Sequence, residues 1–222
     1  MEKRSYEEIS QTGYPNDNLF YDISKRILDV AGALFGVLIC LFFAVILSPF
    51  YIFGKNKGPM VFKQLRTGKN GDAFYIYKFR SMVINAEQEL KNNKILYKKY
   101  IENNYKLEQH EDPRITKLGA FIRKTSIDEF PQFINVLKGD MSLVGPRPVV
   151  EEELREYGQF KHVFLAVKPG ITGYWQASGR SDVGYPERTD IELYYIYNKS
   201  LKLDIKIIIK TVLSVIKVKG AY

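Results

Sequence analysis

Residues 30–53 read VAGALFGVLICLFFAVILSPFYIF and contain no charged side chain. A helix of about 20 apolar residues is long enough to cross a bilayer. A buried core helix is a poorer reading, because this stretch is long and apolar on every face. It is not a cleaved signal peptide, since polar residues 1–24 precede it and no small-x-small cleavage site follows. The sequence therefore predicts a membrane-embedded helix over residues 25–54.

Two features indicate how this helix meets the membrane. Pro49 removes one helical hydrogen bond, and the hydroxyl of Ser48 can satisfy the carbonyl that is set free. Short basic flanks prefer the cytoplasm, and both flanks are basic here. The flanking cations are Lys25, Arg26, Lys55, Lys57, Lys63, Arg66 and Lys69. We therefore predict a re-entrant (monotopic) hairpin that bends near Ser48 and Pro49 and returns to the same face. A kinked spanning helix is the alternative.

Composition limits the class of protein. The chain has 222 residues, enough for one domain with a sizeable core, and 45% of them are hydrophobic. These values exclude a disordered chain and a polytopic membrane protein. The single cysteine, Cys40, excludes a Cys-based zinc site. The net charge of +8 favours a polyanionic partner such as nucleic acid, an anionic membrane or a phosphorylated substrate.

The remaining segments predict an α+β, mainly helical fold. Residues 1–24 read as a loosely ordered polar lead-in, and two short strands flank the turn at residues 68–71 as a small β-hairpin. Residues 83–108 have the spacing of a solvent-facing helix or helix pair. Two later stretches are basic and amphipathic, and each fits either a membrane-interface helix or an ordinary surface helix. Their apolar stripes are Ile115, Leu118 and Ile122, and Leu203, Ile207, Val212 and Ile216.

The hexapeptide SIDEFP, residues 126–131, carries the main chemical signal. One reading is a capping box in which Ser126 and Glu129 cap a helix. Pro131 would then fall inside the first turns, so a helix that starts near Pro131 is favoured. Asp128 and Glu129 would then lie just before a helix N-terminus, where anions are stabilised. An ionised Asp can attack phosphorus, and a neighbouring Glu can hold a divalent cation.

Several cations complement this carboxylate pair. Arg donates two hydrogen bonds at once to phosphate, and Arg147 is held between two prolines. A single Arg is usually a solvated surface charge, but together these residues predict a phosphate-binding site. The candidates are Lys78, Arg80, Arg123, Arg147 and Arg180.

These motifs resemble one family. The apolar segment with Ser-Pro, then KFRSM, DPRITKLGAFIRKTSIDEFPQFINVLKGDMSLVGPRP and KPGITGYWQASGR, are similar to the bacterial sugar transferases, the monotopic phosphoglycosyl transferases that start glycan assembly. The resemblance covers roughly residues 22–218. It implies Mg²⁺-dependent transfer of a sugar 1-phosphate from a UDP-sugar to undecaprenyl phosphate, with release of UMP, at the cytoplasmic face of the bacterial inner membrane. Residues 55–222 would then be the cytosolic catalytic domain with its interface helices.

The resemblance also implies residue roles. Asp128 would be the nucleophile of a ping-pong reaction, and Glu129 the Mg²⁺ ligand beside it. Lys78, Arg123, Arg147 and Arg180 match the active-site cations, and Ser48 and Pro49 match the helix break. Asp204 matches a recurrent acidic position and would be a supporting acid. Glu192 departs from the pattern, because the family often has Asp there, and the extra methylene puts a fine positioning role in question.

The substrate and rival functions complete the expectations. The charged insertion between KFRSM and DPRIT is similar to that of hexose-1-phosphate transferases, which favours UDP-galactose or UDP-glucose and a role in capsule, exopolysaccharide or O-antigen assembly. Membrane lipid is an expected partner, nucleic acid is not, and a homodimer stays open. Some larger members carry a multi-span domain before this module, and we expect none here. The rivals are an inactive membrane scaffold and a nucleic-acid-binding protein, and the apolar run disfavours the second.

Overall fold

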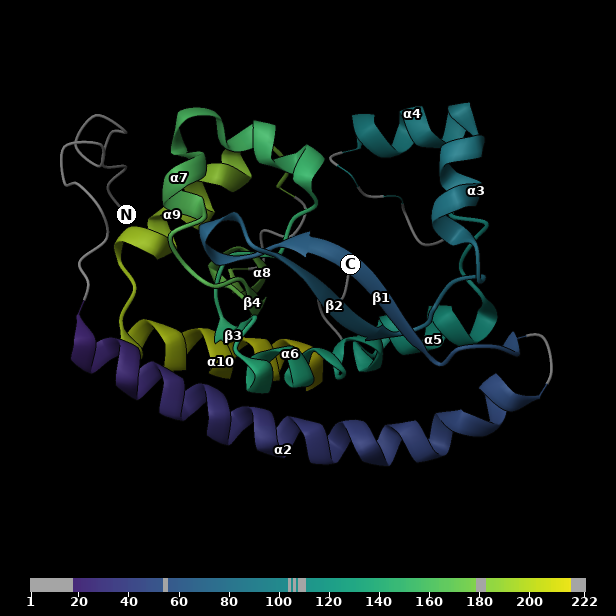
Figure 1. The fold of residues 1–222 in the computed structure, drawn as a ribbon, viewed down its shortest axis with the longest axis horizontal. Coiled ribbons are helices and arrows are strands. Elements are labelled where there is room, and N and C mark those ends of the chain that lie inside the picture. The colour runs from purple at the N-terminus through teal and green to yellow at the C-terminus, as the bar shows by residue number, and fades with distance from the viewer. Residues whose placement is uncertain are drawn as a thin grey trace.

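Helices dominate the computed structural model, which describes residues 18–53, 56–103, 105, 107, 111–178 and 183–216. Figure 1 shows their arrangement. The elements are α2 (Leu19–Ile52), β1 (Val61–Thr67), η2 (Lys69–Gly71), β2 (Ala73–Phe79), α3 (Ala86–Asn92), α4 (Lys94–Glu102), α5 (Lys117–Lys124), η3 (Ile127–Glu129), α6 (Gln132–Lys138), β3 (Ser142–Val144), η4 (Glu151–Phe160), α7 (Lys161–Phe164), β4 (Gly170–Thr172), α8 (Tyr174–Ala177), α9 (Glu187–Tyr197) and α10 (Leu201–Ile216). The predicted α+β, mainly helical class is confirmed.

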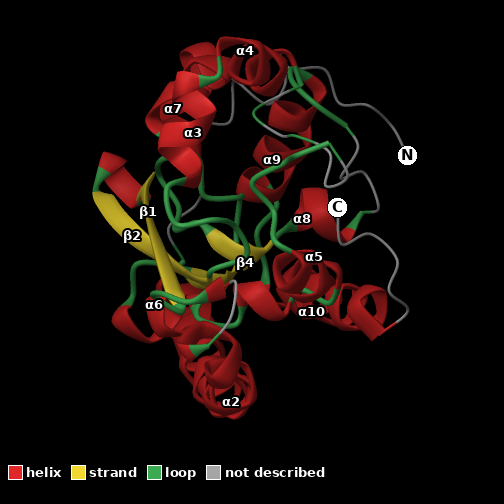
Figure 2. Cartoon of the chain, turned by 90° about the vertical axis from the view of Figure 1, so that its right-hand side faces the viewer, coloured by secondary structure: helices red, strands yellow, loops and turns green. Residues whose placement is uncertain are grey.

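The apolar stretch forms one long helix, α2, beneath the rest of the molecule (Figure 1). Viewed nearly along its axis, α2 lies below the other elements (Figure 2). It begins earlier than predicted, because the side chain of Asn18 accepts a hydrogen bond from the backbone N–H of Tyr21 at 3.2 Å and caps the helix. The predicted lead-in over residues 1–24 is therefore too long, and its residues 1–17 lie outside the described part of the chain.

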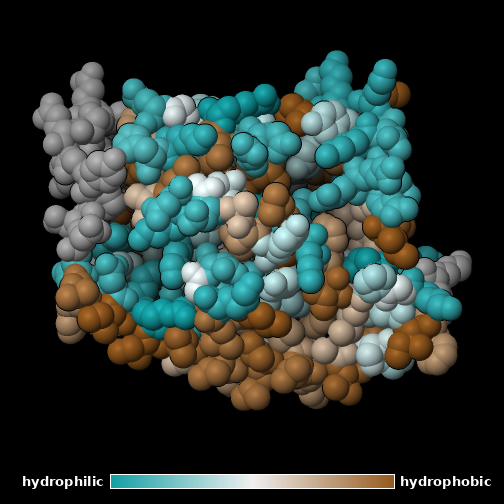
Figure 3. Space-filling model, in the orientation of Figure 1, coloured by the Kyte–Doolittle hydropathy of each residue, from teal (hydrophilic) through white to brown (hydrophobic). Residues whose placement is uncertain are grey.

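The two faces of α2 differ. One face packs against the body of the molecule along the whole helix. Its buried residues are Tyr21, Asp29, Ala33, Gly36, Cys40, Leu47 and Tyr51. The other face exposes large apolar side chains, and α10 exposes several of its own. These residues include Leu34, Phe35, Leu38, Leu41, Phe42 and Val45 on α2, and Ile205, Ile209 and Val212 on α10. Figure 3 shows the resulting hydrophobic band along the lower edge of the molecule.

This band has the character of a membrane-contacting surface. Monomeric soluble proteins rarely expose a contiguous apolar patch larger than a few hundred Å². Within the described residues, α2 is also the one helix that is long and apolar enough to cross a membrane. Membrane association is therefore supported by both the exposed surface and the length of the helix.

The break in α2 is repaired as predicted. Pro49 lies inside the helix and has no N–H, so the carbonyl of Val45 loses the donor four residues on. The hydroxyl of Ser48 donates to that carbonyl at 2.9 Å instead. The helix therefore continues to Ile52 as one curved element rather than as two separate arms. Its return to the same membrane face stays a prediction.

Both ends of α2 are tied to the body. Near the N-terminal end, Lys25 donates to the carboxylate of Asp204 at 2.8 Å, and this fully buried carboxylate also accepts from Tyr21 and Tyr195. Near the other end, the hydroxyl of Tyr51 donates to the carbonyl of Arg80 at 2.5 Å. The prediction of Asp204 as a supporting acid is therefore not supported. Its three partners occupy it in holding α10 and α9 to α2.

The secondary structure after α2 matches the pattern of the sequence. The predicted hairpin is confirmed as β1 paired antiparallel with β2, with Asn70 and Gly71 at positive φ in the turn. The predicted helix pair is confirmed as α3 and α4. The parallel pair of β3 with β4 was not predicted, since each of these strands has only three residues.

The two amphipathic stripes differ in their surroundings. On α5, Ile122 is fully buried and Leu118 packs with it against α2, so the ordinary surface-helix alternative is right for this stripe. On α10, Ile207 is buried in the core, whereas Val212 is exposed. The side chain of Ile216 lies outside the described residues. Contact of α10 with a membrane interface therefore stays a prediction, and its exposed apolar positions are compatible with it.

Two glycines let the body approach α2 closely. A Cβ at Gly32 would lie 2.6 Å from Cδ1 of Leu143, and a Cβ at Gly36 would overlap the ring of Phe133 on α6. The four-residue spacing places both glycines on the buried face. The absence of a side chain at each position sets how near β3 and α6 can lie to the helix.

We expect Gly36→Ala to lower the free energy of unfolding by about 1–3 kcal/mol, because the ring of Phe133 must shift. The sign is diagnostic, since Ala in a helix interior otherwise stabilises by about 1 kcal/mol relative to Gly. Denaturant unfolding in detergent micelles measures the effect. Leu38→Ala, on the exposed face of α2, is the control and should change the unfolding free energy much less. A stabilised Gly36→Ala variant would contradict the packing described here.

Candidate active site

The two carboxylates lie in the short turn η3, between α5 and α6. Ser126 adopts a left-handed conformation with φ 55° and its side chain makes no capping bond, so the capping-box alternative is wrong. Helix α6 begins at Gln132 directly after Pro131, as predicted. Asp128 and Glu129 are thus held just ahead of a helix.

The underside of this turn rests on α2. Ile127 is buried in a cluster with Cys40 and Leu47 of that helix. Phe130 packs against the same cluster, and its ring centroid lies 5.4 Å from that of Phe43. Full burial of a large apolar side chain contributes about 1.5–3 kcal/mol, which applies to Ile127, and the partly buried Phe130 contributes less. The residues flanking the carboxylates therefore fix the turn on the apolar helix.

Asp128 is buried, with 7% of its surface exposed. Burial raises the pKa of Asp128 to about 6, and the negative charge of Glu129 acts in the same direction. The positive charges of Lys78 and Arg123 oppose the rise. A carboxyl with a pKa near 6 is still mostly ionised at pH 7, so Asp128 keeps the charge that an attacking oxygen needs.

Glu129 is strongly paired. The ammonium of Lys78, near the end of β2, donates to its Oε1 at 2.7 Å. Desolvation opposes ionisation, but the charge and hydrogen bond of Lys78 outweigh it, so the pKa of Glu129 is lowered. Arg147 and the buried amide of Gln132 also lower it. Gln132 is uncharged and was not predicted as a site residue, and its place in the first turn of α6 becomes visible only in the structure.

Arg123 offers an unused donor. It lies in the last turn of α5, near enough to Asp128 to affect its pKa. Its Nη1 is buried and, within the described part of the chain, has no hydrogen-bond partner. An unpaired buried donor is costly, so few survive in folded proteins without a function. The position fits an acceptor that comes from a ligand, such as a phosphate oxygen.

Arg147 reaches the pair from a different segment. It lies in the loop after β3, where Gly145 packs against the backbone of Lys168 and Gly170 too closely for any side chain. Its positive charge contributes to the lowered pKa of Glu129, so Arg147 lies close enough to act on the carboxylate pair. The structure thus brings Lys78, Arg123 and Arg147 toward the carboxylates. Arg180 lies outside the described residues.

Arg80 has a structural role instead of the predicted phosphate-binding one. Its side chain is buried, and it donates to the carbonyls of Pro59 at 2.7 Å, of Met82 at 3.2 Å and of Asn56. Its guanidinium also lies 5.2 Å from the ring centroid of Tyr51. All three nitrogens are therefore occupied in joining the segment after α2 to the end of β2.

The donor set limits how a metal could bind. Among the described residues no three His, Cys, Asp or Glu side chains converge. Mg²⁺ usually keeps several waters and binds through one or two carboxylates plus substrate phosphates. The adjacent carboxylates of Asp128 and Glu129 fit that mode, with the bond from Lys78 to Glu129 as the competing interaction.

Comparison with known proteins identifies the family. The sequence model described as bacterial sugar transferase matches residues 20–218, which include every residue of the site described above.

The chain belongs to the bacterial sugar transferase family.

Curated relatives agree with this assignment. The chain is 48% identical over 200 residues to the galactosyl transferase CpsE of Streptococcus agalactiae, covering 90% of this chain and 43% of the relative. It is 42% identical over 209 residues to the undecaprenyl-phosphate galactose phosphotransferase of Salmonella typhimurium, covering 90% and 44%. It is 39% identical over 210 residues to the exopolysaccharide production protein ExoY of Sinorhizobium fredii, covering 90% and 88%. The chain thus spans less than half of the first two relatives and most of the third.

For this member of the family, we expect the catalytic rate to fall about tenfold between pH 7 and pH 5, as Asp128 takes up a proton. The measurement is the initial rate of product release against pH. The pKa of Asp128 is higher in the folded protein than its ordinary value of 3.8, so protonation of this carboxyl favours the folded state. Unfolding caused by protonation of Asp128 would therefore not explain the loss of catalytic rate. A flat profile down to pH 5 would contradict the assignment.

A second prediction separates Arg123 from Arg80. Arg123→Ala should lower turnover about 100-fold and leave the free energy of unfolding unchanged or higher, because it removes an unpaired buried donor. Arg80→Ala should lower the free energy of unfolding by about 1–3 kcal/mol, because three carbonyls lose their donor. Turnover and unfolding are measured on both variants. If the same variant shows the larger loss both of turnover and of unfolding free energy, the assignment of a ligand-binding role to Arg123 and a structural role to Arg80 is wrong.

Proposed function

We propose that this chain is a phosphoglycosyl transferase that moves a sugar 1-phosphate from a UDP-sugar to undecaprenyl phosphate and releases UMP. The observation that carries the proposal is the buried Asp128 beside Glu129, with Lys78, Arg123 and Arg147 directed to the pair, on a turn packed against an apolar helix. A nucleophile, cations for phosphate and a membrane surface are what transfer between a soluble and a lipid substrate requires.

The proposed location is the cytoplasmic face of the bacterial inner membrane, with α2 entering and leaving on that side. Tyr21 and Lys25 at one end of α2, and Tyr51 at the other, all contact the same body. A straight spanning helix would carry one of its ends away from that body. The contacts at both ends therefore support the re-entrant arrangement over the kinked span.

In the first proposed step, a carboxylate oxygen of Asp128 attacks the sugar-linked phosphorus of the UDP-sugar. A bond forms between that oxygen and phosphorus, and the bond from phosphorus to the oxygen bridging to the other phosphate breaks. UMP leaves, and the sugar phosphate stays on Asp128. Arg123 and Arg147 offset the negative charge of the diphosphate, which is the usual source of rate acceleration in phosphoryl transfer.

In the second step, a phosphate oxygen of undecaprenyl phosphate attacks the same phosphorus and the bond to Asp128 breaks. The product is a sugar linked to the lipid by a diphosphate, and Asp128 is regenerated. Covalent catalysis divides one difficult transfer into two displacements, and it predicts ping-pong kinetics. The position of the turn on α2 supports entry of the second substrate from the membrane side.

Mg²⁺ is part of the proposal. It would be held by Glu129 with Asp128 adjacent, and it would supply charge neutralisation for the substrate phosphates. Lys78 would remain beside the pair and keep Glu129 ionised, since its bond lowers the pKa of that carboxyl.

The proposed sugar is galactose or glucose, and the proposed pathway is the first membrane step of capsule, exopolysaccharide or O-antigen assembly. The printed names of the relatives support this, since two refer to galactose transfer and one to exopolysaccharide production. The alternative is a catalytically inactive membrane scaffold, which the shared apolar surface alone would equally suit.

We expect detergent-purified protein, incubated with Mg²⁺ and UDP-galactose or UDP-glucose without lipid, to gain the mass of one hexose phosphate in intact-protein mass spectrometry. Asp128→Asn should abolish the adduct, because an amide cannot attack phosphorus. Asp72→Asn is the matched control, since Asp72 is an exposed carboxylate in the β1–β2 turn.

UMP release is recorded in the same samples with and without undecaprenyl phosphate, because an adduct that hydrolyses would escape detection. If no hexose gives either an adduct or lipid-dependent release of UMP, the transferase proposal is refuted and the scaffold is favoured. An adduct that survives in Asp128→Asn would place the nucleophile elsewhere.

A further inference from the structure

The loop that carries Arg147 is fixed by its backbone. The carbonyl of Pro146 accepts from the N–H of Gly170 at 2.9 Å, and the carbonyl of Pro148 accepts from Arg66 at 3.2 Å. The two prolines have no N–H, so Arg147 holds the one backbone donor of residues 146–148. A hydrogen bond from this N–H is therefore the one way in which a backbone donor of residues 146–148 can hold the segment in place.

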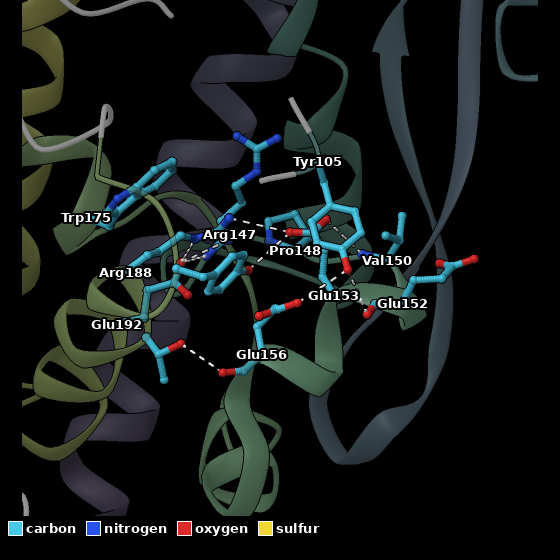
Figure 4. Close-up of polar contacts among 12 residues, drawn as sticks. Tyr105, Arg147, Pro148, Val150, Glu152, Glu153, Glu156, Trp175, Arg188 and Glu192 are labelled. Carbon is cyan, nitrogen blue, oxygen red and sulfur yellow. Dashed lines mark hydrogen bonds and ion pairs between the residues drawn. The ribbon is translucent and has the colours of Figure 1, made fainter. Parts of the chain in front are cut away.

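Glu192 on α9 accepts that bond. Its Oε1 lies 3.2 Å from the backbone nitrogen of Arg147, and Glu192 is 2% exposed. The same oxygen accepts from Nε and Nη2 of Arg188 at 3.4 Å, while Oε2 accepts from the hydroxyl of Tyr157. Figure 4 shows Glu192 and Arg188 beside Arg147, together with Trp175. The ring of Trp175 lies 4.6 Å from the guanidinium of Arg188. The carboxylate is thus fixed by Arg188 and Tyr157, and its bond to the N–H of Arg147 restricts the movement of the loop.

A second buried carboxylate offers a comparison within the same cluster. Glu153 on η4 also pairs with Arg188, at 3.5 Å, and accepts from Arg66 at 3.5 Å and from the hydroxyl of Tyr185 at 3.2 Å. It is 4% exposed and accepts from the backbone N–H of Val150 at 3.5 Å, but it makes no bond to Arg147. Glu153 and Glu192 therefore share an arginine and a similar burial, and they differ in the bond to the backbone of Arg147.

The side chain of Arg147 is left for a ligand. Among the residues that the structure describes, its guanidinium makes no hydrogen bond, whereas its backbone is held. Its charge helps to lower the pKa of Glu129, so the guanidinium acts on the carboxylate pair. Hence the bonds at the backbone of Arg147, rather than contacts of its side chain, set where the guanidinium can point.

We propose that Glu192 is a positioning residue that fixes the direction of Arg147 through the backbone bond, and so sets how this arginine meets the substrate diphosphate. This inference rests on the proposed function, because Arg147 is taken to bind phosphate. Length is what Glu192 supplies: its side chain spans from α9 to the loop while still pairing with Arg188. Asp would keep the charge for Arg188 but stop one methylene short of the backbone of Arg147.

Two substitutions separate reach from charge. Glu192→Gln keeps the length and an acceptor for the N–H of Arg147, and the hydroxyl of Tyr157 can reverse to accept from the new amide. It loses the buried charge opposite Arg188, so it should be the less stable variant. Glu192→Asp keeps the charge and loses the reach. We therefore expect Glu192→Asp to reduce kcat/KM about tenfold, more than Glu192→Gln does, while its unfolding temperature falls less.

The test is a double-mutant cycle with Arg147→Ala, measured as kcat/KM for lipid-dependent UMP release and as the unfolding temperature. If Glu192 acts through Arg147, Glu192→Asp should cause no further loss of kcat/KM in the Arg147→Ala background. Glu153→Gln is the matched control: it should lower the unfolding temperature comparably and leave kcat/KM within about threefold of wild type.

Each outcome is decisive. If the fold-losses of kcat/KM from the two substitutions multiply in the double variant, the positioning role is refuted. It is also refuted if Glu192→Asp is as active as wild type. In both cases UMP release by the wild-type protein would still support the transferase. A drop in kcat/KM for Glu153→Gln as large as for Glu192→Asp would show a purely structural cluster. Wild-type protein that releases no UMP would refute the proposed function, and this inference with it.

Discussion

The packing of one face of α2 against the rest of the chain is the constraint on which the structure depends. A helix that is apolar all round is stable in a globular context only if both faces are covered, or if one face meets lipid. Here the buried face supplies the base of the core from Tyr21 to Tyr51, and the opposite face carries the exposed apolar band. Removing α2 would leave the turn at Asp128 without support, because Ile127 and Phe130 pack on it. The same helix, α2, thus carries the exposed apolar face and supports the turn that holds the carboxylates.

The site itself depends on charges whose partners come from separate segments. Lys78 is contributed by β2, Arg123 by α5 and Arg147 by the loop after β3, whereas the carboxylates lie in η3. Buried ions are stable only when each has a partner or a ligand to meet. Glu129 has Lys78, while Nη1 of Arg123 has no acceptor among the described residues. The incomplete pairing of the site contrasts with the complete pairing of Asp204.

Local features could be predicted from the sequence because their causes are local. The β1–β2 hairpin follows from turn residues, the start of α6 from Pro131, and the bond from Ser48 to Val45 from the proline one residue later. The coarse class and the membrane helix follow from hydrophobic patterning. The family motifs around Asp128 and Arg147 could also be found, since they are contiguous.

What could not be predicted is the partner of each buried charge. Arg80 and Arg123 look alike in the sequence, yet Arg80 donates to three carbonyls, whereas Nη1 of Arg123 has no partner in the part of the chain that the structure describes. Asp204 and Glu192 carried family-level expectations, but their contacts come from residues 35 to 183 positions away, as well as from their own neighbourhood. Such distances are set by packing, which no local pattern encodes. The same holds for the start of α2, where one cap at Asn18 outweighed the polar character of the preceding residues.

The direct contact between the turn and α2 also fixes a height. An α-helix with its side chains is about 10–12 Å across. If the exposed face of α2 lies in lipid, Asp128 sits about one helix diameter above the acyl chains, and this spacing cannot change without separating Phe130 from Phe43. A lipid-borne phosphate would then reach the nucleophile at the level of its own head group. The enzyme and the second substrate would then meet by diffusion in the plane of the membrane, and α2 would set the distance between the bilayer and the reacting groups.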